Sequence, residues 1–228
     1  GVISPLLANI FLHEALDLWF ESEVRPRMRG RAFMVRYADD AVLCFEREKD
    51  ARRVLTVLPK RLDRFGLTLH PDKTRLVRFR RPPQRGGRGR CDDTEKPGSF
   101  ELLGFTHYWG RSRKGRWVVK RKTTGARFSR ALGEIAQWCR KARHLPIGVQ
   151  HRTLARKLRG HYAYFGITGN AGALSRFLYS VKRIWRKWLD RRSQRARTHW
   201  EKFNRLLERY PLPPPVVVHS VYRRAANP

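Results

Sequence analysis

The chain has 228 residues, enough for one large or two small domains, and 51 Lys and Arg against 19 Asp and Glu give it a formal charge of +32. Such a charge favours a polyanionic partner, with nucleic acid first and an anionic membrane second. The chain holds no apolar run of about 18 residues, which excludes a membrane-spanning helix. Aromatic residues make up 11% of the chain, which excludes a disordered basic tail.

The three cysteines, Cys44, Cys91 and Cys139, lie far apart and show no Cys-x-x-Cys spacing. They predict neither a zinc cluster nor a disulfide framework, and they favour a reducing compartment, the cytoplasm. The first residues include neither an initiator Met nor a signal peptide. We therefore expect the chain to be a piece of a longer protein.

The first predicted element is a helix over residues 4–21. Ser4 suits the N-cap and Pro5 the first helical position. Apolar residues then recur at helical spacing, which by itself predicts an amphipathic core helix: Leu6, Leu7, Ile10, Phe11 and Leu18. Residues 1–12, Gly-Val-Ile-Ser-Pro-Leu-Leu-Ala-Asn-Ile-Phe-Leu, resemble motif B of the reverse transcriptases encoded by group II introns, although the usual preceding Pro-Gln-Gly is missing. The resemblance implies that Ser4 and Pro5 lie near the templating base and the incoming nucleotide.

A hairpin is predicted over residues 33–45, where two β-forming runs flank Asp39 and Asp40. Two adjacent carboxylates need a cation, and Mg²⁺ is commonly held by one or two carboxylates together with substrate phosphates. The dipeptide alone favours an ordinary solvated turn. The full Tyr-Ala-Asp-Asp of residues 37–40 resembles motif C of reverse transcriptases. That resemblance implies catalytic, Mg²⁺-binding roles for Asp39 and Asp40 and a substrate or primer contact for Tyr37.

A second helix is predicted over residues 48–65, kinked or shortened by Pro59 and ended by Gly66, with a strand over residues 75–79. Residues 66–74, Gly-Leu-Thr-Leu-His-Pro-Asp-Lys-Thr, resemble motif D of the same family. The resemblance implies that Lys73 protonates the leaving pyrophosphate. A solvated loop lysine is the alternative interpretation.

Residues 80–98 are rich in Pro, Gly and Arg and predict an exposed connector that touches phosphate, if anything. β character resumes over residues 100–107, where Leu103-Gly104-Phe105 resembles motif E, the primer grip. The resemblance implies that Leu103 and Gly104 contact the primer, and a glycine permits close approach of a backbone. The four motifs follow the order of the second half of a polymerase palm, which we assign to residues 1–109.

Residues 110–228 are predicted to be an all-α region of three amphipathic helices packed as a small bundle. Residues 158–166, Leu-Arg-Gly-His-Tyr-Ala-Tyr-Phe-Gly, resemble the maturase-specific domain X of group II intron proteins. The resemblance implies that this region serves as the polymerase thumb and binds intron RNA. The Pro-rich residues 211–216 predict a stiff tail that either packs on the thumb or is disordered.

Residues 176–205 hold eleven Lys or Arg against Asp190 and Glu201, with three tryptophans among them. A solvated helix face is the simplest explanation, but the density and helical phasing of the charges favour a surface that follows phosphates. The candidate RNA-binding residues are Arg159, Lys182, Arg183, Arg186, Lys187, Arg191 and Arg192.

Together these elements predict an α+β chain, with part of a palm (an antiparallel sheet and two packing helices) followed by a three-helix thumb. The implied parent is an RNA-directed DNA polymerase and splicing maturase that uses Mg²⁺, a dNTP, an intron RNA template and a DNA primer. The fingers and the motif A aspartate are expected upstream, so this chain alone is expected to be inactive. A non-catalytic RNA-binding maturase relic is the main alternative, and a retron-type reverse transcriptase is a third. The oligomeric state stays open.

Overall fold

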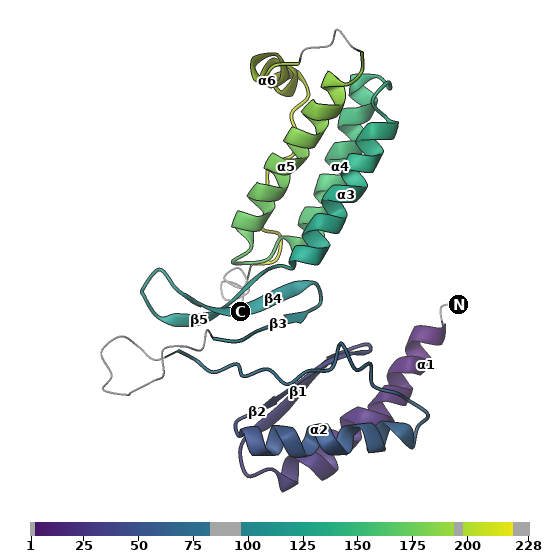
Figure 1. Ribbon diagram of the computed structural model, residues 1–228, viewed down its shortest axis with the longest axis vertical. Coiled ribbons are helices and arrows are strands. Elements are labelled where there is room, and N and C mark those ends of the chain that lie inside the picture. The colour runs from purple at the N-terminus through teal and green to yellow at the C-terminus, as the bar shows by residue number, and fades with distance from the viewer. Residues whose placement is uncertain (1–2, 83–96, 194–197, 221–228) are drawn as a thin grey trace, which may run out of the picture. The chain divides into compact units, whose positions relative to one another are not determined.

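The computed structural model describes residues 3–82, 97–193 and 198–220. The chain divides into two compact units, Gly1–Arg80 with Glu95–Gly98 and Arg81–Thr94 with Ser99–Pro228. Each unit holds an antiparallel sheet and helices, which confirms the α+β class (Figure 1). Cys91 and most of the predicted connector lie outside the described residues. No helix in the described ranges has the length and apolar character needed to cross a bilayer.

The first unit begins with a long helical stretch. Helix α1 (Ile3–Leu12) continues as π-helical segments at His13–Leu18 and Phe20–Val24 and a 3₁₀ turn at Arg25–Arg27. The predicted helix is therefore present, but it already includes Ile3, so the prediction of Ser4 as its N-cap is wrong.

The apolar stripe of α1 was predicted to face the core, but it is exposed: α1 buries none of its residues. Leu6, Leu7 and Ile10 are 62%, 58% and 54% exposed. The buried residues come from the following turns: Ala15, Leu16, Trp19, Phe20 and Val24. Periodicity gives a helix its apolar face, but another element must lie against that face to bury it.

The hairpin is confirmed. Strands β1 (Ala32–Tyr37) and β2 (Asp40–Phe45) pair antiparallel, with Tyr37 opposite Asp40. Their inner face carries Met34, Leu43 and Phe45 onto a core built from the π-helical segments and α2. Their outer face leaves the side chains of Phe33, Val35 and Tyr37 57–67% exposed.

Helix α2 (Glu48–Asp63) runs through Pro59 without ending there, and Gly66 follows with φ +67°. Its buried Val54, Leu58 and Leu62 complete the core of the first unit. The strand predicted over residues 75–79 is absent. A strand needs a regular ladder of backbone hydrogen bonds to a partner strand, and among the described residues no such ladder includes this segment.

The second unit opens with a three-stranded antiparallel sheet in the order β3-β4-β5, formed by Ser99–Leu102, Phe105–Arg111 and Trp117–Thr123. Strand β5 was not predicted, because this region was expected to be helical throughout. Its Trp-Val-Val start favours a strand, and Gly115, with φ +71°, supplies the turn that returns the chain from β4.

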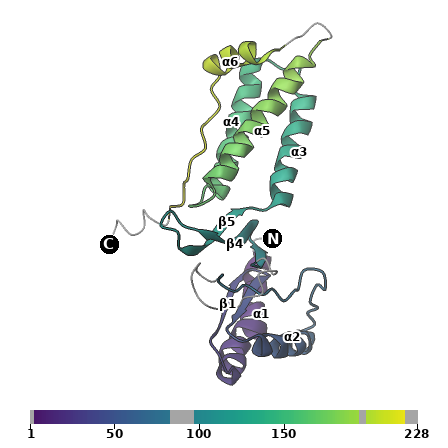
Figure 2. The same ribbon diagram turned by 60° about the vertical axis from the view of Figure 1, so that its left-hand side comes forward.

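The predicted helical bundle is confirmed and gains a fourth helix. Helices α3 (Gly125–Lys141), α4 (Ile147–Phe165) and α5 (Ala171–Asp190) run side by side, and α6 (Trp200–Arg209) lies across one end (Figures 1 and 2). The buried side chains between them include Leu154, Leu174, Phe177, Trp185 and Phe203. Cys139 is also buried there, and burial raises the pKa of its thiol to about 12.

Two buried amides, neither of them predicted, connect the elements of this unit. Gln150, 1% exposed, accepts from Trp185 Nε1 at 2.9 Å and donates to the Leu145 carbonyl at 2.8 Å. Asn170, also 1% exposed, binds both the backbone N–H and the hydroxyl of Thr123 at 3.0 and 2.9 Å. The second amide therefore joins the end of β5 to the α4–α5 connection.

The Pro-rich tail packs back on the bundle, one of the two outcomes predicted for it. Figure 2 shows it returning beside α4. Tyr162 donates its hydroxyl hydrogen to the Pro213 carbonyl at 3.2 Å, and a ring nitrogen of His151 lies 2.9 Å from the Pro211 carbonyl oxygen. The tail crosses the end of α4 at Gly166, where a Cβ atom would lie 2.7 Å from the Val216 carbonyl oxygen.

Candidate active site

The two adjacent carboxylates lie at the tip of the β1–β2 hairpin. Ala38 and Asp39 form the turn, and Asp40 is the first residue of β2. Both aspartates are exposed, and within the described residues neither forms an ion pair with a Lys or Arg. The turn requires Ala38 to adopt φ +53°, a left-handed conformation that residues with a Cβ rarely adopt.

These carboxylates suit Mg²⁺, because they are oxygen donors, accessible and not neutralised by a neighbouring cation. They do not form a complete protein cage. In the described ranges no group of three or more His, Cys, Asp or Glu side chains gathers in one place. A pair of this kind fits a site in which substrate phosphates or further protein groups supply the remaining ligands.

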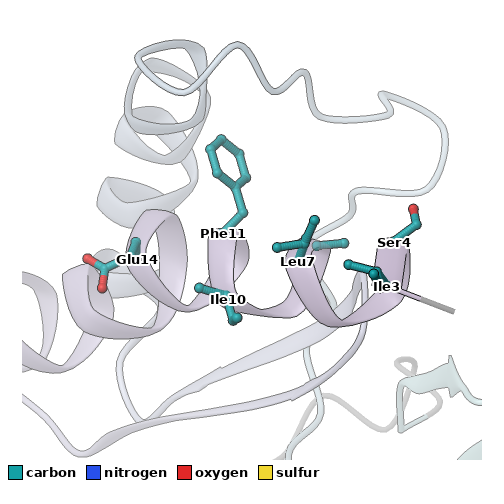
Figure 3. A pocket seen from close by; sticks show the side chains of 7 residues that line it. Ile3, Ser4, Leu7, Ile10, Phe11 and Glu14 are labelled. Atoms are coloured by element: carbon teal, nitrogen blue, oxygen red, sulfur yellow. The ribbon is translucent and has the colours of Figure 1, made fainter. Parts of the chain in front are cut away.

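The other predicted residues of the first unit lie on different elements. Tyr37, 67% exposed, stands on the outer face of the hairpin opposite Asp40. Ser4 and Pro5 lie on α1, where Ser4 borders a shallow hollow walled mainly by apolar side chains of that helix (Figure 3). Lys73 is exposed in a turn, and no hydrogen bond or ion pair links it to either aspartate within the described residues.

Leu103 and Gly104 form the tight β3–β4 turn in the second unit, with φ of +51° and +75°. The Leu103 carbonyl accepts from the Tyr164 hydroxyl at 3.0 Å, and the Thr124 N–H donates to the Gly104 carbonyl at 3.0 Å. A hollow beside this turn is lined by Arg127, Arg130 and Glu134 of α3 and by Tyr164 and Phe165 of α4. The turn is therefore fixed by the helices and lies beside two arginines.

The predicted RNA-binding cations fall into two groups. Arg159, Arg183, Lys187 and Arg191 are exposed on or after α4 and α5, and Lys182 is half-buried. Arg186 and Arg192 instead bind the protein's own backbone: Arg186 donates to the Thr198 carbonyl, and Arg192 to the carbonyls of residues 144 and 145. The guanidinium of Arg186 also lies 4.5 Å from the centre of the Trp200 ring.

Sequence reasoning missed a network directly behind the hairpin tip. Arg36 donates to both carboxylate oxygens of Asp17, to the side-chain oxygen of Asn9 and to the Ala38 carbonyl. The sequence did contain a signal. Strand alternation places Arg36 on the same inward face as Ala32 and Met34, and a charge on a buried face needs a partner.

Comparison with known families finds a match over the first part of the chain. Residues 1–107 match the reverse transcriptase (RNA-dependent DNA polymerase) family. The match includes the aspartate tip, Lys73, Leu103 and Gly104, whereas Arg159 and the cations of α5 lie beyond it. Reverse transcriptases act on a nucleic acid template and primer and generally use divalent metal ions. No curated protein matches the chain.

Proposed function

We propose that the chain is part of a group II intron reverse transcriptase and maturase. Residues 1–109 contribute to its palm, and residues 110–228 form the thumb and domain X. The reverse transcriptase match, with two uncompensated carboxylates at an exposed hairpin tip, supports the polymerase role. The bundle that carries residues 158–166 and a row of exposed cations supports the RNA-binding role. The whole protein would copy intron RNA from a DNA primer and assist splicing.

In this proposal Asp39 and Asp40 hold Mg²⁺, and Tyr37 contacts substrate or primer from the neighbouring strand. Bound Mg²⁺ supplies charge stabilisation for the attacking and leaving oxygens of nucleotidyl transfer. Ser4 and Pro5 contact the base pair being formed, and Lys73 gives a proton to the pyrophosphate. Leu103 and Gly104 hold the primer, on a turn that Tyr164 and Thr124 fix from behind.

The two aspartates alone should bind Mg²⁺ weakly, since the described residues gather no third acidic ligand. We assign the third carboxylate, and the residues that hold the dNTP, to polymerase segments not among those described. Two exposed apolar surfaces support this assignment. One is the face of α1 around Leu6 and Leu7, and the other is the outer hairpin face with Phe33 and Val35. Apolar patches of this kind usually mark surfaces that another element covers.

Primer extension on an RNA template tests the proposal. The complete gene product should synthesise cDNA, and Asp39→Ala should abolish that synthesis while RNA affinity changes by less than about twofold, because most of the positive charge lies elsewhere. The 228-residue chain alone should bind RNA and extend nothing. Efficient synthesis by the chain alone, or by the Asp39→Ala gene product, would refute these metal-binding roles.

The charge of +32 and the exposed cations also favour a second candidate, an RNA-binding maturase relic without polymerase activity. The coding sequence upstream distinguishes the two. An intact motif A aspartate in frame supports the enzyme, whereas a stop codon or frameshift supports the relic. RNA binding without extension by the complete gene product would favour the relic as well.

A further inference from the structure

The hairpin tip is tied to the first helix by one side chain. Arg36 Nε and Nη2 donate to the two carboxylate oxygens of Asp17 at 2.7 and 2.6 Å, which forms a bidentate pair. Its remaining amino group, Nη1, donates to Asn9 Oδ1 and to the Ala38 carbonyl, both at 2.9 Å. The side chains of Arg36 and Asp17 are only 12% and 23% exposed. All of these acceptors belong to the first unit.

The contact with Ala38 matters because of the conformation at that residue. Ala38 directly precedes Asp39 and has φ +53°, a left-handed conformation that is strained for a residue with a Cβ. A strained turn persists only where its surroundings hold it. Arg36 supplies that restraint, because its guanidinium plane is fixed by Asp17 and Asn9 while it holds the Ala38 carbonyl.

The ion pair with Asp17 also determines which carboxylate neutralises the positive charge of Arg36. An arginine three residues before one aspartate and four before another would ordinarily tend to neutralise them. Here its charge is matched by Asp17, whose pKa is lowered chiefly by the hydrogen bonds from Arg36 and also by His13. Asp39 and Asp40 form no ion pair within the described residues, so they keep their charge available for a cation.

We propose that Arg36 is a positioning residue for the acidic tip, and that Asp17 is the counterion that keeps its guanidinium away from Asp39 and Asp40. Arg36 holds the Ala38 turn and thereby the direction of both carboxylates, and Asp17 preserves their affinity for a divalent cation. The proposal rests on the proposed metal-binding role of the tip. The alternative is an ion pair that only stabilises the first unit.

Mn²⁺ binding to the 228-residue chain, followed by electron paramagnetic resonance, tests this without requiring polymerase activity. The signal removed by the double change Asp39→Asn with Asp40→Asn defines binding at the tip. Arg36→Lys keeps the charge but loses the planar fork, and it should weaken tip binding about threefold. Asp17→Asn keeps the shape but frees a positive charge near the tip, and it should weaken binding about fivefold.

A matched pair on α2 provides the control. Arg52 donates to Glu48 Oε1 from Nε at 2.9 Å and from Nη2 at 2.6 Å. Arg52→Lys and Glu48→Gln should leave Mn²⁺ binding at the tip unchanged. Thermal unfolding reports whether each variant folds, and the conservative Arg36→Lys keeps the test valid if Asp17→Asn does not fold.

The possible outcomes distinguish failure of the positioning role of Arg36 and Asp17 from failure of the metal-binding role of the tip. If wild type binds Mn²⁺ at the tip and both Arg36→Lys and Asp17→Asn bind it equally well, the positioning role is wrong and the network is only structural. If wild type shows no binding that depends on Asp39 and Asp40, even with an RNA–DNA template–primer present, the metal-binding role itself fails and this inference fails with it.

Discussion

The Tyr164 hydroxyl on α4 donates to the carbonyl oxygen of Leu103, 61 positions earlier in the chain, at a distance of 3.0 Å. The same tyrosine ring stacks on Phe105, with ring centres 6.0 Å apart and planes 12° from parallel. A turn in which Leu103 and Gly104 both have positive φ is thereby fixed to a rigid helix. If this turn holds the primer, its geometry is set by the helical bundle.

Tyr164→Phe should remove this hydrogen bond and keep the ring stack. Because the bond is partly exposed, we expect the free energy of unfolding to fall by about 0.5–1 kcal/mol. Tyr179→Phe is the control, since Tyr179 is 58% exposed and its hydroxyl makes no hydrogen bond within the described residues. Urea denaturation of both variants measures the difference, and equal midpoints would contradict the role given to Tyr164.

Asn170→Ala should destabilise the second unit far more. The change leaves the Thr123 N–H and the Phe165 carbonyl without their buried side-chain partner, at a cost of about 3 kcal/mol. Asn204→Ala, at an exposed position on α6, serves as the control and should cost little. Equal urea midpoints for the two variants would show that the Asn170 network does not hold β5 to the α4–α5 connection.

Acidification should destabilise the bundle in a defined pH range. Burial lowers the pKa of His161 to about 4, and its ring stacks on Phe177 at 3.7 Å between centres. Below pH of about 6.5 the unfolded chain binds a proton that folded His161 does not accept. Stability is therefore fully present above that pH and falls as the pH drops towards 4.

Burial and nearby Arg121 lower the pKa of His107 as well, so it adds to the same slope. His161→Phe should flatten the pH dependence of the urea midpoint between pH 6.5 and 4, whereas Asn204→Ala, at an exposed position on α6, should not. A His161→Phe pH profile that still follows wild type would contradict this prediction.

Asp17 affects stability in a separate pH range. Because its pKa is lowered in the folded protein, the stability that it contributes is lost only at lower pH, when the carboxylate is protonated.

The predicted RNA-binding residues should separate into two behaviours. Arg183→Ala and Lys187→Ala, at exposed positions on α5, should weaken RNA binding. A plot of log affinity against log salt concentration should also become less steep, by about 0.7 for every phosphate that the protein no longer neutralises. Arg186→Ala should instead mainly lower the thermal unfolding temperature, because Arg186 binds the Thr198 carbonyl and the Trp200 ring.

Filter-binding titrations at several salt concentrations, together with melting curves, distinguish these behaviours. Glu208→Gln, at an exposed position on α6, is a control for surface changes that leave every phosphate-binding cation in place. A salt slope that stays at the wild-type value in the Arg183→Ala, Lys187→Ala double variant would exclude this face of α5 as the contact surface.

Sequence patterns predicted the elements whose signals are local. Alternating residues around Tyr-Ala-Asp-Asp predicted the β1–β2 hairpin, and helical spacing predicted α2 to α5. These patterns failed where the structure depends on contacts with residues far away in the sequence. Residues 75–79 look like a strand but are not one in the structure, and α1 has an apolar face yet buries none of its residues.

The candidate site shows the same division. Asp39, Asp40 and the Leu103–Gly104 turn were predicted from local motifs, and the structure places them on hairpin turns. Asn9 and Asp17 were not predicted, because their link to Arg36 spans 27 and 19 positions in the chain. Only the strand alternation, which places Arg36 on the inward face of β1, indicated that its charge needs a partner.

Gly166 has a consequence for how this protein can vary. Position 166 carries no side chain, and a methyl group there would collide with the Tyr162 carbonyl oxygen in the last turn of α4 and with the Val216 carbonyl oxygen of the tail. A substitution there should therefore shift both the end of α4 and the tail, whose own Leu212, 8% exposed, belongs to the core of the bundle. One hydrogen atom in place of one methyl thus lets residues 211–218 lie against the bundle and supply a leucine to its hydrophobic core.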